Sequence, residues 1–163
     1  MDEGKELEGA LREWLAGAGT VVVAGIGNPI RRDDQAGVRV VEGLRGAVSP
    51  RVHLIECETV PESFVDEIVD VSPTHVLLID AALLGLPPGT VDLYDVEEVA
   101  ATAGIATHAL PLRVLCEYVT LLTGARIALL LIEPEDTGFG EGMTPGLEAA
   151  TRRTVGMLTA LLP

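Results

Sequence analysis

Five short apolar runs, each followed by a segment with turn or helical character, constrain the fold of this chain more than any other feature. Four of the runs are dominated by Val, Ile, Leu and Ala, which is typical of strands that a sheet buries on both faces. The run at 91–96 instead alternates apolar and polar residues, as strands at a sheet edge do. In chain order the runs lie at 20–24, 52–55, 76–79, 91–96 and 127–132.

The segments between these runs carry apolar residues at intervals of three and four, which predicts amphipathic helices. Strands that alternate with helices favour a mostly parallel sheet with helices on both faces. The short Pro87-Pro88-Gly89 link indicates that the strand after it runs antiparallel at the sheet edge. We therefore expect an α/β fold, a three-layer α/β/α sandwich with a five-stranded mostly parallel sheet and one antiparallel edge strand. The expected helices lie at 6–16, 35–44, 62–71, 110–122 and 147–162.

The length of 163 residues fits one domain with its own core. We expect a single domain over 1–163, in which 1–19 form an N-terminal helical extension and 20–163 form the core. No apolar run approaches the length of a membrane span, and the acidic first residues are unlike a signal peptide. We therefore expect a cytoplasmic protein without membrane association, and a monomer.

The charge balance excludes one class of partner. The chain has 25 acidic and 11 basic residues, a formal net charge of −14. Such a surface repels phosphate backbones, so we expect no nucleic-acid partner. The same charge suits a basic protein partner or a cation, although solubility alone would also explain it.

The nucleophilic side chains give no conventional hydrolase pattern. Cys57 and Cys116 are too far apart for a CxxC pair, and we expect both to be buried. Cys57 could pair with His108, but the neighbouring Glu56 and Glu58 would raise the pKa of its thiol, which disfavours a cysteine hydrolase. The chain also lacks the G-x-S-x-G elbow of serine hydrolases.

Polar side chains instead gather after the predicted strands. Open α/β sheets bind ligands outside the carboxyl ends of their strands. Asp33 and Asp34 follow the first strand, and Asp80 ends the third. His108 comes at the start of the helix after the fourth strand, and Glu133 follows the fifth. Carboxylates and one imidazole are therefore expected at one edge of the sheet.

Asp34, Asp80 and His108 form the sharpest set among these residues. Two carboxylates and an imidazole bind zinc, nickel, cobalt or iron and leave coordination positions open. Each residue also has a structural interpretation: either Asp33 or Asp34 caps a helix, Asp80 caps a turn, and His108 serves the fold. The other histidines, His53 and His75, are expected to be structural.

The loop after the first strand supports this edge. Gly25-x-Gly27 resembles the start of a dinucleotide fingerprint, but Ile30 occupies the place of its third glycine. The alternative is a tight turn where the backbone approaches a neighbour closely. Asn28 and the backbone amides near Gly27 are candidates for stabilising an oxyanion.

Several motifs together resemble one family. The segment from Gly25 to Gly37 resembles the GxGNxxxxDDxxG signature of hydrogenase maturation proteases. Further elements similar to that family follow in order, and the likeness runs from about residue 21 to 162, closest to an archaeal branch of the formate-hydrogenlyase type. They are Val60-Pro61-Glu62-Ser63-Phe64, Ile79-Asp80-Ala81, Thr107-His108-Ala109-Leu110-Pro111-Leu112, Leu131-Ile132-Glu133-Pro134 and Phe139-Gly140-Glu141-Gly142-Met143-Thr144-Pro145.

The resemblance implies an endopeptidase that removes the C-terminal extension of a [NiFe]-hydrogenase large-subunit precursor after nickel insertion. It implies that Asp34, Asp80 and His108 recognise the nickel carried by the precursor, without an organic cofactor. The chain departs from the pattern at Gln35, where Gly or Ala is frequent, and at Glu133, where some relatives have Gln. These departures bear on substrate preference rather than on the implied ligands.

The sequence leaves the chemical step open. The metal would polarise the scissile carbonyl or activate a water, or Asp34 or Asp33 would act as general base. Two alternatives from other classes also remain: a nucleotide-binding α/β module and a non-catalytic nickel-binding accessory protein. An independent zinc aminopeptidase is a weaker alternative among enzymes.

Overall fold

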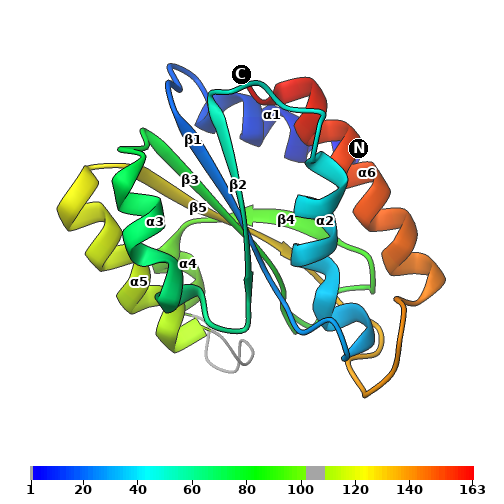
Figure 1. Cartoon of the computed structure of the whole chain (residues 1–163). Helices are drawn as coiled ribbons and strands as arrows, with labels where there is room; N and C mark the ends of the chain where they lie inside the picture. The colour runs from blue at the N-terminus through cyan, green and yellow to red at the C-terminus, as the bar shows by residue number, and fades with distance from the viewer. Residues whose placement is uncertain (1, 102–108) are drawn as a thin grey trace.

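The computed structural model describes residues 2–101 and 109–163, with the backbone alone at 100–101 and 109–112. Five strands form one sheet in the order β2-β1-β3-β5-β4 (Figure 1). β1, β2, β3 and β5 are parallel, and β4 pairs antiparallel with β5 at the sheet edge, as predicted. The strands are β1 Val21–Ile26, β2 Val52–Glu58, β3 His75–Ala81, β4 Val91–Tyr94 and β5 Arg126–Ile132.

Helices cover both faces of this sheet, which confirms the three-layer sandwich (Figure 1). One face packs against α1 Glu3–Trp14, α2 Ala36–Leu44 and α6 Pro145–Leu161. The other face packs against α3 Val65–Asp70, α4 Val96–Ala101 and α5 Ala109–Thr123. Two short 3-10 turns, η1 Arg32–Gln35 and η2 Pro61–Phe64, precede α2 and α3.

The uniform hydrophobicity of β3 follows from its position in the middle of the sandwich. Leu77 and Ile79 pack into the cluster under α1, α2 and α6. Val76 and Leu78 point to the opposite face and pack under α3 and α5. Because successive side chains of a strand alternate between faces, a strand buried on both sides has no polar face. Each fully buried Leu or Ile contributes roughly 1.5–3 kcal/mol.

Two glycines bring α2 unusually close to the sheet. A Cβ atom at Gly25 would lie 2.3 Å from the carbonyl oxygen of Gly37, and one at Gly37 would lie 2.1 Å from that of Ile79. The start of α2 therefore lies directly over the carboxyl ends of β1 and β3. The close approach predicted for Gly25 is confirmed, and the neighbour that it admits is the following helix.

The segment after Val91 differs from the sequence prediction. The strand expected at 91–96 ends at Tyr94, and the next residues form α4, a helix that was not predicted. Asp95 Oδ1 accepts a hydrogen bond from the Glu98 N–H at 2.7 Å, and Glu98 Oε1 accepts one from the Asp95 N–H at 3.3 Å. This reciprocal pair is a capping box, which starts a helix where the alternating pattern alone favoured more strand.

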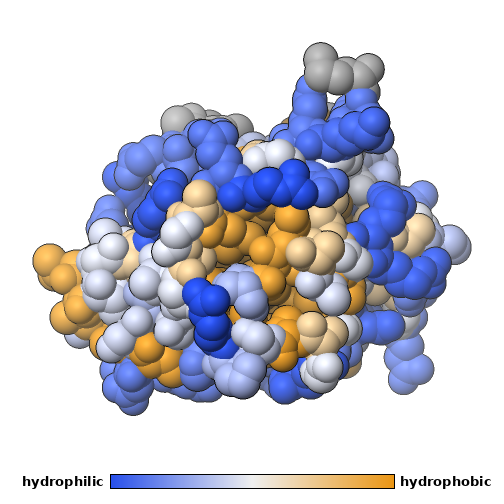
Figure 2. Space-filling model, turned by 90° about the horizontal axis from the view of Figure 1, so that it is seen from above, coloured by the Kyte–Doolittle hydropathy of each residue, from blue (hydrophilic) through white to orange (hydrophobic). Residues whose placement is uncertain are grey.

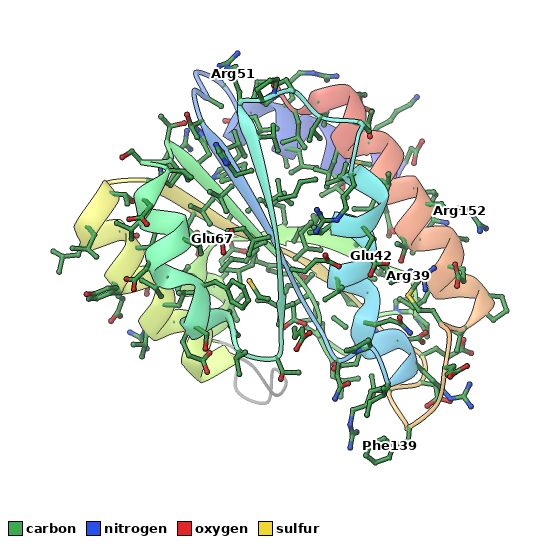
Figure 3. The ribbon with its side chains drawn as sticks, viewed as in Figure 1. Arg39, Glu42, Arg51, Glu67, Phe139 and Arg152 are labelled. Atoms are coloured by element: carbon green, nitrogen blue, oxygen red, sulfur yellow. The ribbon has the colours of Figure 1, made fainter. Side chains whose placement is uncertain are left out.

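Figure 2 views the molecule from above, onto the edge where the parallel strands begin. Hydrophobic surface lies at the centre and at the left of this view, and hydrophilic residues lie mainly above it and to its right (Figure 2). Arg51, labelled at the top of Figure 3, ties this edge together by donating to the carbonyl oxygens of Gly19 and Ala18 at 3.1 and 2.6 Å. In the described part of the chain, no helix combines the length and apolarity needed to cross a membrane.

Candidate active site

Asp34 and Asp80 lie at the same edge of the sheet, where the parallel strands end. Asp80 is the penultimate residue of β3 and is only 3% exposed. It pairs in register with Leu131, which packs into the cluster under α3 and α5. Asp34 lies in η1, which packs against β3. The chain thus folds two carboxylates that are 46 positions apart onto one edge.

His108, the third member of the predicted set, lies outside the described residues. The first described residue after it, Ala109, begins α5, and α5 packs on the face to which the alternation of β3 assigns Asp80. Among the side chains that the structure describes, no three His, Cys, Asp or Glu residues form a group that could hold a metal ion. The set of three therefore stays a prediction.

A short network of hydrogen bonds holds Asp34 in place. Its Oδ2 atom accepts a bond from the backbone N–H of Asn28 at 3.1 Å. The Asn28 side-chain Oδ1 in turn accepts from the N–H of Ile30 at 3.1 Å. Asp34 is half-buried, and its backbone N–H donates to the carbonyl oxygen of Arg31 at 2.9 Å. A carboxylate oriented in this way is available to a ligand.

Asp33, the adjacent residue, is fully buried and has a structural role. Its Oδ2 accepts from the backbone N–H groups of Glu135 and Asp136, both at 2.9 Å. Both of its oxygens also accept from Thr144, through the N–H and the hydroxyl, at 2.8 Å each. Neither aspartate caps η1 or α2, so the predicted capping role is wrong. Four bonds engage the Asp33 carboxylate, which argues against Asp33 as the general base.

The glycine loop offers little to a phosphate group. The Gly27 N–H donates to the carbonyl oxygen of Glu58 at 2.7 Å, and the N–H of Arg31 donates to that of Asn28 at 3.1 Å. Because the N–H groups of Asn28 and Ile30 are also engaged, the loop cannot cradle an anion with its backbone. The predicted use of the Gly27 amide in an oxyanion site is therefore wrong. In the described part of the chain, no acceptor meets the Asn28 side-chain N–H₂.

Glu133 also serves the fold of this edge, which sequence reasoning missed. It is 3% exposed, and its Oε1 accepts from the backbone N–H groups of Leu84 and Leu86, both at 2.8 Å. These bonds fix the loop after β3 against the end of β5. Both bonds need only an acceptor oxygen, which Gln also has, so a Gln at this position would keep the loop in place.

Gln35 is the other departure from the family pattern. It follows Asp34 in η1 and is 6% exposed. Its Nε2 atom is buried and has no hydrogen-bond partner among the described residues. A buried amide without a partner is costly, by roughly 1–3 kcal/mol, and such groups are rare in folded proteins. Nothing in the structure explains the choice of Gln here.

The cysteines are buried, as predicted. Burial raises the pKa of the Cys57 thiol to about 12, and the charges of Glu67 and Glu62 add to the shift. The sequence reasoning had the direction right but assigned the shift to Glu56 and Glu58. Burial likewise raises the pKa of Cys116 to about 12. A thiolate nucleophile at either position is disfavoured.

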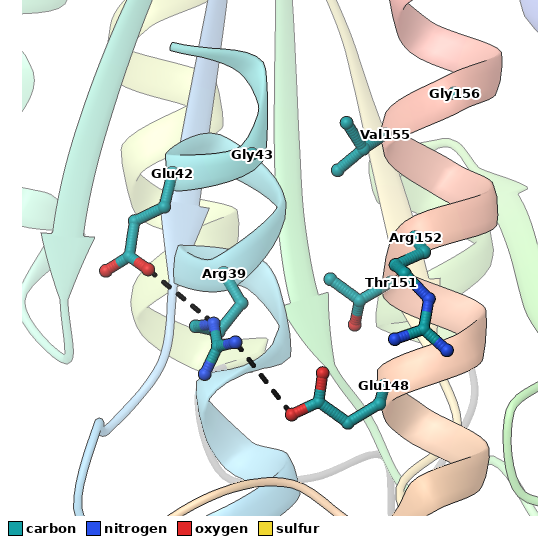
Figure 4. A pocket seen from close by; sticks show the side chains of 8 residues that line it. All are labelled: Arg39, Glu42, Gly43, Glu148, Thr151, Arg152, Val155 and Gly156. Atoms are coloured by element: carbon teal, nitrogen blue, oxygen red, sulfur yellow. Dashed lines mark ion pairs between the residues drawn. The ribbon is translucent and has the colours of Figure 1, made fainter.

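A concave region lies between α2 and α6, away from these residues. Figure 4 shows Arg39 at its centre, with ion pairs to Glu42 at 3.6 Å and to Glu148 at 3.8 Å. The groove has a volume of about 600 Å³ and contains none of the predicted site residues. It is lined by Arg39, Glu42, Gly43, Glu148, Thr151, Arg152, Val155 and Gly156.

Comparisons with known proteins identify the family of the chain. The family model described as hydrogenase maturation protease matches residues 38–161, a range that includes Asp80 and His108 and begins after Asp34. A putative hydrogenase maturation protease of Methanocaldococcus jannaschii is 31% identical over 137 residues, which cover 79% of this chain and 80% of that protein.

Two further relatives extend the comparison. The hydrogenase 3 maturation protease of Escherichia coli K12 is 30% identical over 131 residues, which cover 80% of this chain and 83% of that protein. The crystal structure of the [NiFe] hydrogenase maturation protease HycI from Thermococcus kodakarensis has a TM-score of 0.86 and 32% identity, covering 94% of this chain and 98% of that one. Because the family model spans most of the chain and these relatives match 79% to 94% of it, the chain belongs to the hydrogenase maturation protease family of endopeptidases.

Proposed function

We propose that this peptidase removes the C-terminal extension of a nickel-loaded [NiFe]-hydrogenase large-subunit precursor. In this proposal Asp34, Asp80 and His108 contact the nickel that the precursor carries. The main support is that Asp34 and Asp80, which match family motif positions, both lie at the carboxyl edge of the sheet. The inclusion of His108 in this set rests on the sequence motif alone.

The residue types suit a metal ion that the substrate carries and that the enzyme binds only in part. Two carboxylates and one imidazole leave coordination positions open, and a precursor that already holds nickel can fill them. A precursor without nickel lacks this bond, so its binding is weaker. The difference in affinity lets the enzyme act on metallated precursor in preference to unmetallated precursor.

Hydrolysis then needs an activated water and a polarised carbonyl. The nickel of the substrate would supply one of these effects, by polarising the carbonyl or by lowering the pKa of a bound water. Asp34 is the better general base of the adjacent pair, because four hydrogen bonds already engage Asp33. The proton taken from water passes to the leaving amine nitrogen as the C–N bond breaks. In this proposal the side-chain N–H₂ of Asn28 stabilises the oxyanion.

A cleavage assay tests this proposal. Purified precursor, with and without nickel, is incubated with the wild type, Asp34→Asn and Asp80→Asn, and the shortened product is measured. We expect product from nickel-loaded precursor with the wild type, and loss of product with either variant. Glu13→Gln is the matched control, because Glu13 is an exposed acid on α1, away from this edge. Full cleavage by Asp34→Asn, or equal cleavage of both precursor forms, would contradict the proposal.

The nucleotide-binding alternative has no comparable support. The space beside Gly25 is filled by the backbone of α2, and the N–H groups of the loop are engaged within the protein. A nucleotide would therefore find neither the cavity nor the donors that a dinucleotide fingerprint provides.

A further inference from the structure

The large apolar side chains that the described residues expose fall into two groups. One group follows the carboxyl ends of the strands, at the edge that carries Asp34 and Asp80. We call this group the apolar rim: Ile30, Val60, Leu83, Leu86 and Phe139. The other group forms a stripe on the outer side of α5: Val114, Tyr118, Leu121 and Leu122. Apolar surface that gathers in one place on a protein marks an interaction site more often than scattered residues do.

The loops that carry the apolar rim are tied to one another by backbone hydrogen bonds. The Gly27 N–H donates to Glu58, which joins the loops after β1 and β2. The Gly140 N–H donates to the carbonyl oxygen of Ile30 at 3.0 Å, which joins the loops after β1 and β5. The contacts of Glu133 join the loop after β3 to β5. The rim therefore presents its side chains from a fixed frame.

Phe139 is the most exposed member of the rim, at 70%. Figure 3 shows it at the lower end of the molecule, pointing away from the core. The Arg31 guanidinium lies over its ring, 4.1 Å from the centroid, and donates to the carbonyl oxygen of Thr137 at 3.4 Å. An aromatic ring held outward by a cation is preorganised for contact, which is a common property of residues that dominate binding energy.

The rim is also acidic. Its loops, at 27–35, 58–64, 80–86 and 133–144, carry nine acidic residues against the bases Arg31 and Arg32. Arg31 stacks on Phe139, and Arg32 pairs with Asp136 at 3.6 Å, so both bases are already engaged. Six of these acidic residues are at least partly exposed, namely Asp34, Glu58, Glu62, Glu135, Asp136 and Glu141, whereas Asp33, Asp80 and Glu133 are buried. A second copy of this chain would bring the same charge to the contact, whereas a basic partner would be attracted.

We propose that the apolar rim binds an extended segment of the precursor next to the scissile bond, in which apolar side chains alternate with Lys or Arg. The inference rests on the proposed function and names the chemistry of the segment that this site accepts. Apolar side chains of the segment pack against Ile30, Leu83 and Phe139, and its cations lie among the carboxylates. The rim acts on binding, so its loss raises KM more than it lowers kcat.

Three labelled peptides measure this preference directly, by fluorescence anisotropy with the whole protein. One alternates Leu and Lys, one alternates Leu and Glu, and one alternates Ser and Lys. We expect the Leu–Lys peptide to bind at least about tenfold more tightly than the other two. We also expect its affinity to fall with added salt, because the attraction between exposed charges is screened. Equal binding of the Leu–Lys and Leu–Glu peptides would overturn the proposal.

Substitutions at the rim and on α5 test where the peptide binds. Phe139→Ser and Leu83→Ser should each lower the affinity for the Leu–Lys peptide about tenfold, as the loss of a dominant contact does. With nickel-loaded precursor they should raise KM by a similar factor and change kcat less than about twofold. Leu121→Ser on α5 is the matched control, because Leu121 is even more exposed, at 82%. An equal effect of Leu121→Ser would contradict a site at the rim.

Asp34→Asn separates this inference from the proposed function. It should bind the Leu–Lys peptide within about threefold of the wild type, because it removes one carboxylate among several at the rim, and it should leave the precursor uncut. If the rim variants cleaved nickel-loaded precursor with the KM and kcat of the wild type, the inference would be overturned and the proposed function would stay intact. Peptide binding at the rim with no cleavage of nickel-loaded precursor by the wild type would instead overturn the proposed function, and the inference with it.

Discussion

The Asp33 carboxylate accepts two hydrogen bonds from Thr144, one from its backbone N–H and one from its hydroxyl, each at 2.8 Å. Thr144 is the N-cap residue of α6, so this pair fixes the start of the last helix to the turn after β1. The neighbouring Asp34 lies in the same turn and is only half-buried. The two adjacent aspartates thus differ in role: Asp33 holds the edge together, whereas one hydrogen bond, from the Asn28 N–H, orients Asp34.

The first prediction separates these two roles. Asp33→Asn places an N–H₂ group among N–H and O–H donors and removes a buried charge that they stabilise. We expect a loss of roughly 2–4 kcal/mol in the free energy of unfolding, measured by urea denaturation. Asp34→Asn should change that free energy by less than about 1 kcal/mol, because a half-buried carboxylate with one hydrogen bond contributes little. An equal loss in both variants would contradict this division.

The second prediction concerns the contact between α2 and the sheet. A Cβ at Gly37 would lie 2.1 Å from the carbonyl oxygen of Ile79 and 2.4 Å from that of Ile26, so Gly37→Ala must displace the helix or the strands. We expect a loss of about 3 kcal/mol or more in the free energy of unfolding, together with loss of cleavage.

Gly9→Ala is the control for that substitution. Gly9 lies inside α1, and a Cβ there would meet no atom within 4 Å. Removing a helical glycine should stabilise the protein by about 0.5–1 kcal/mol. If Gly37→Ala were as stable as Gly9→Ala, the close packing of α2 on β1 and β3 would be wrong.

The third prediction concerns the thiols. Since burial raises the pKa of both Cys57 and Cys116 to about 12, roughly one thiol in ten thousand is ionised at about pH 8. We expect neither to react with iodoacetamide in the folded protein, and both to react in urea, as mass spectrometry can count. Cys57→Ala should still cleave the precursor. Rapid alkylation of the native protein would contradict the burial of these groups.

The fourth prediction concerns His75, which packs edge-on against Trp14 with ring centroids 5.1 Å apart. Burial lowers the pKa of His75 below its usual value, and the charge of Arg126 adds to the shift. The unfolded chain therefore binds a proton more readily than the folded one as the pH falls below about 6.5. Stability is unaffected well above that pH and is lost as the pH drops through it towards the lower folded pKa.

His75→Phe tests this titration, because Phe keeps an aromatic ring and does not ionise. The difference in free energy of unfolding between the variant and the wild type should be constant above about pH 7.5. Below about pH 6.5 it should shift in favour of the variant. A difference that does not change with pH would show that His75 does not couple folding to protonation.

Much of the architecture could be predicted from hydrophobic periodicity, because β3 and β5 are buried on both faces and contain almost only apolar residues. The antiparallel edge strand followed from the short link before Val91. The helix α4 was missed although Asp95 and Glu98 have the spacing of a capping box. In that stretch the alternating apolar pattern outweighed the local signal.

The candidate site was predictable only in outline. The edge where Asp34 and Asp80 meet follows from strand order and from the position of each residue after its strand. The roles of Asp33 and Glu133 could not be predicted, because their partners lie about 50 to 110 residues away in the chain. Such contacts exist only once the loops of the edge are folded together.

The central claim is that this edge recognises the nickel of the precursor and cleaves beside it. The most direct measurement compares the rate of C-terminal cleavage of nickel-loaded precursor with that of the same precursor without nickel, using the wild type and Asp80→Asn. The account predicts rapid processing only for wild type with nickel-loaded precursor. Processing by Asp80→Asn at the wild-type rate, or processing that ignores the nickel, would contradict it.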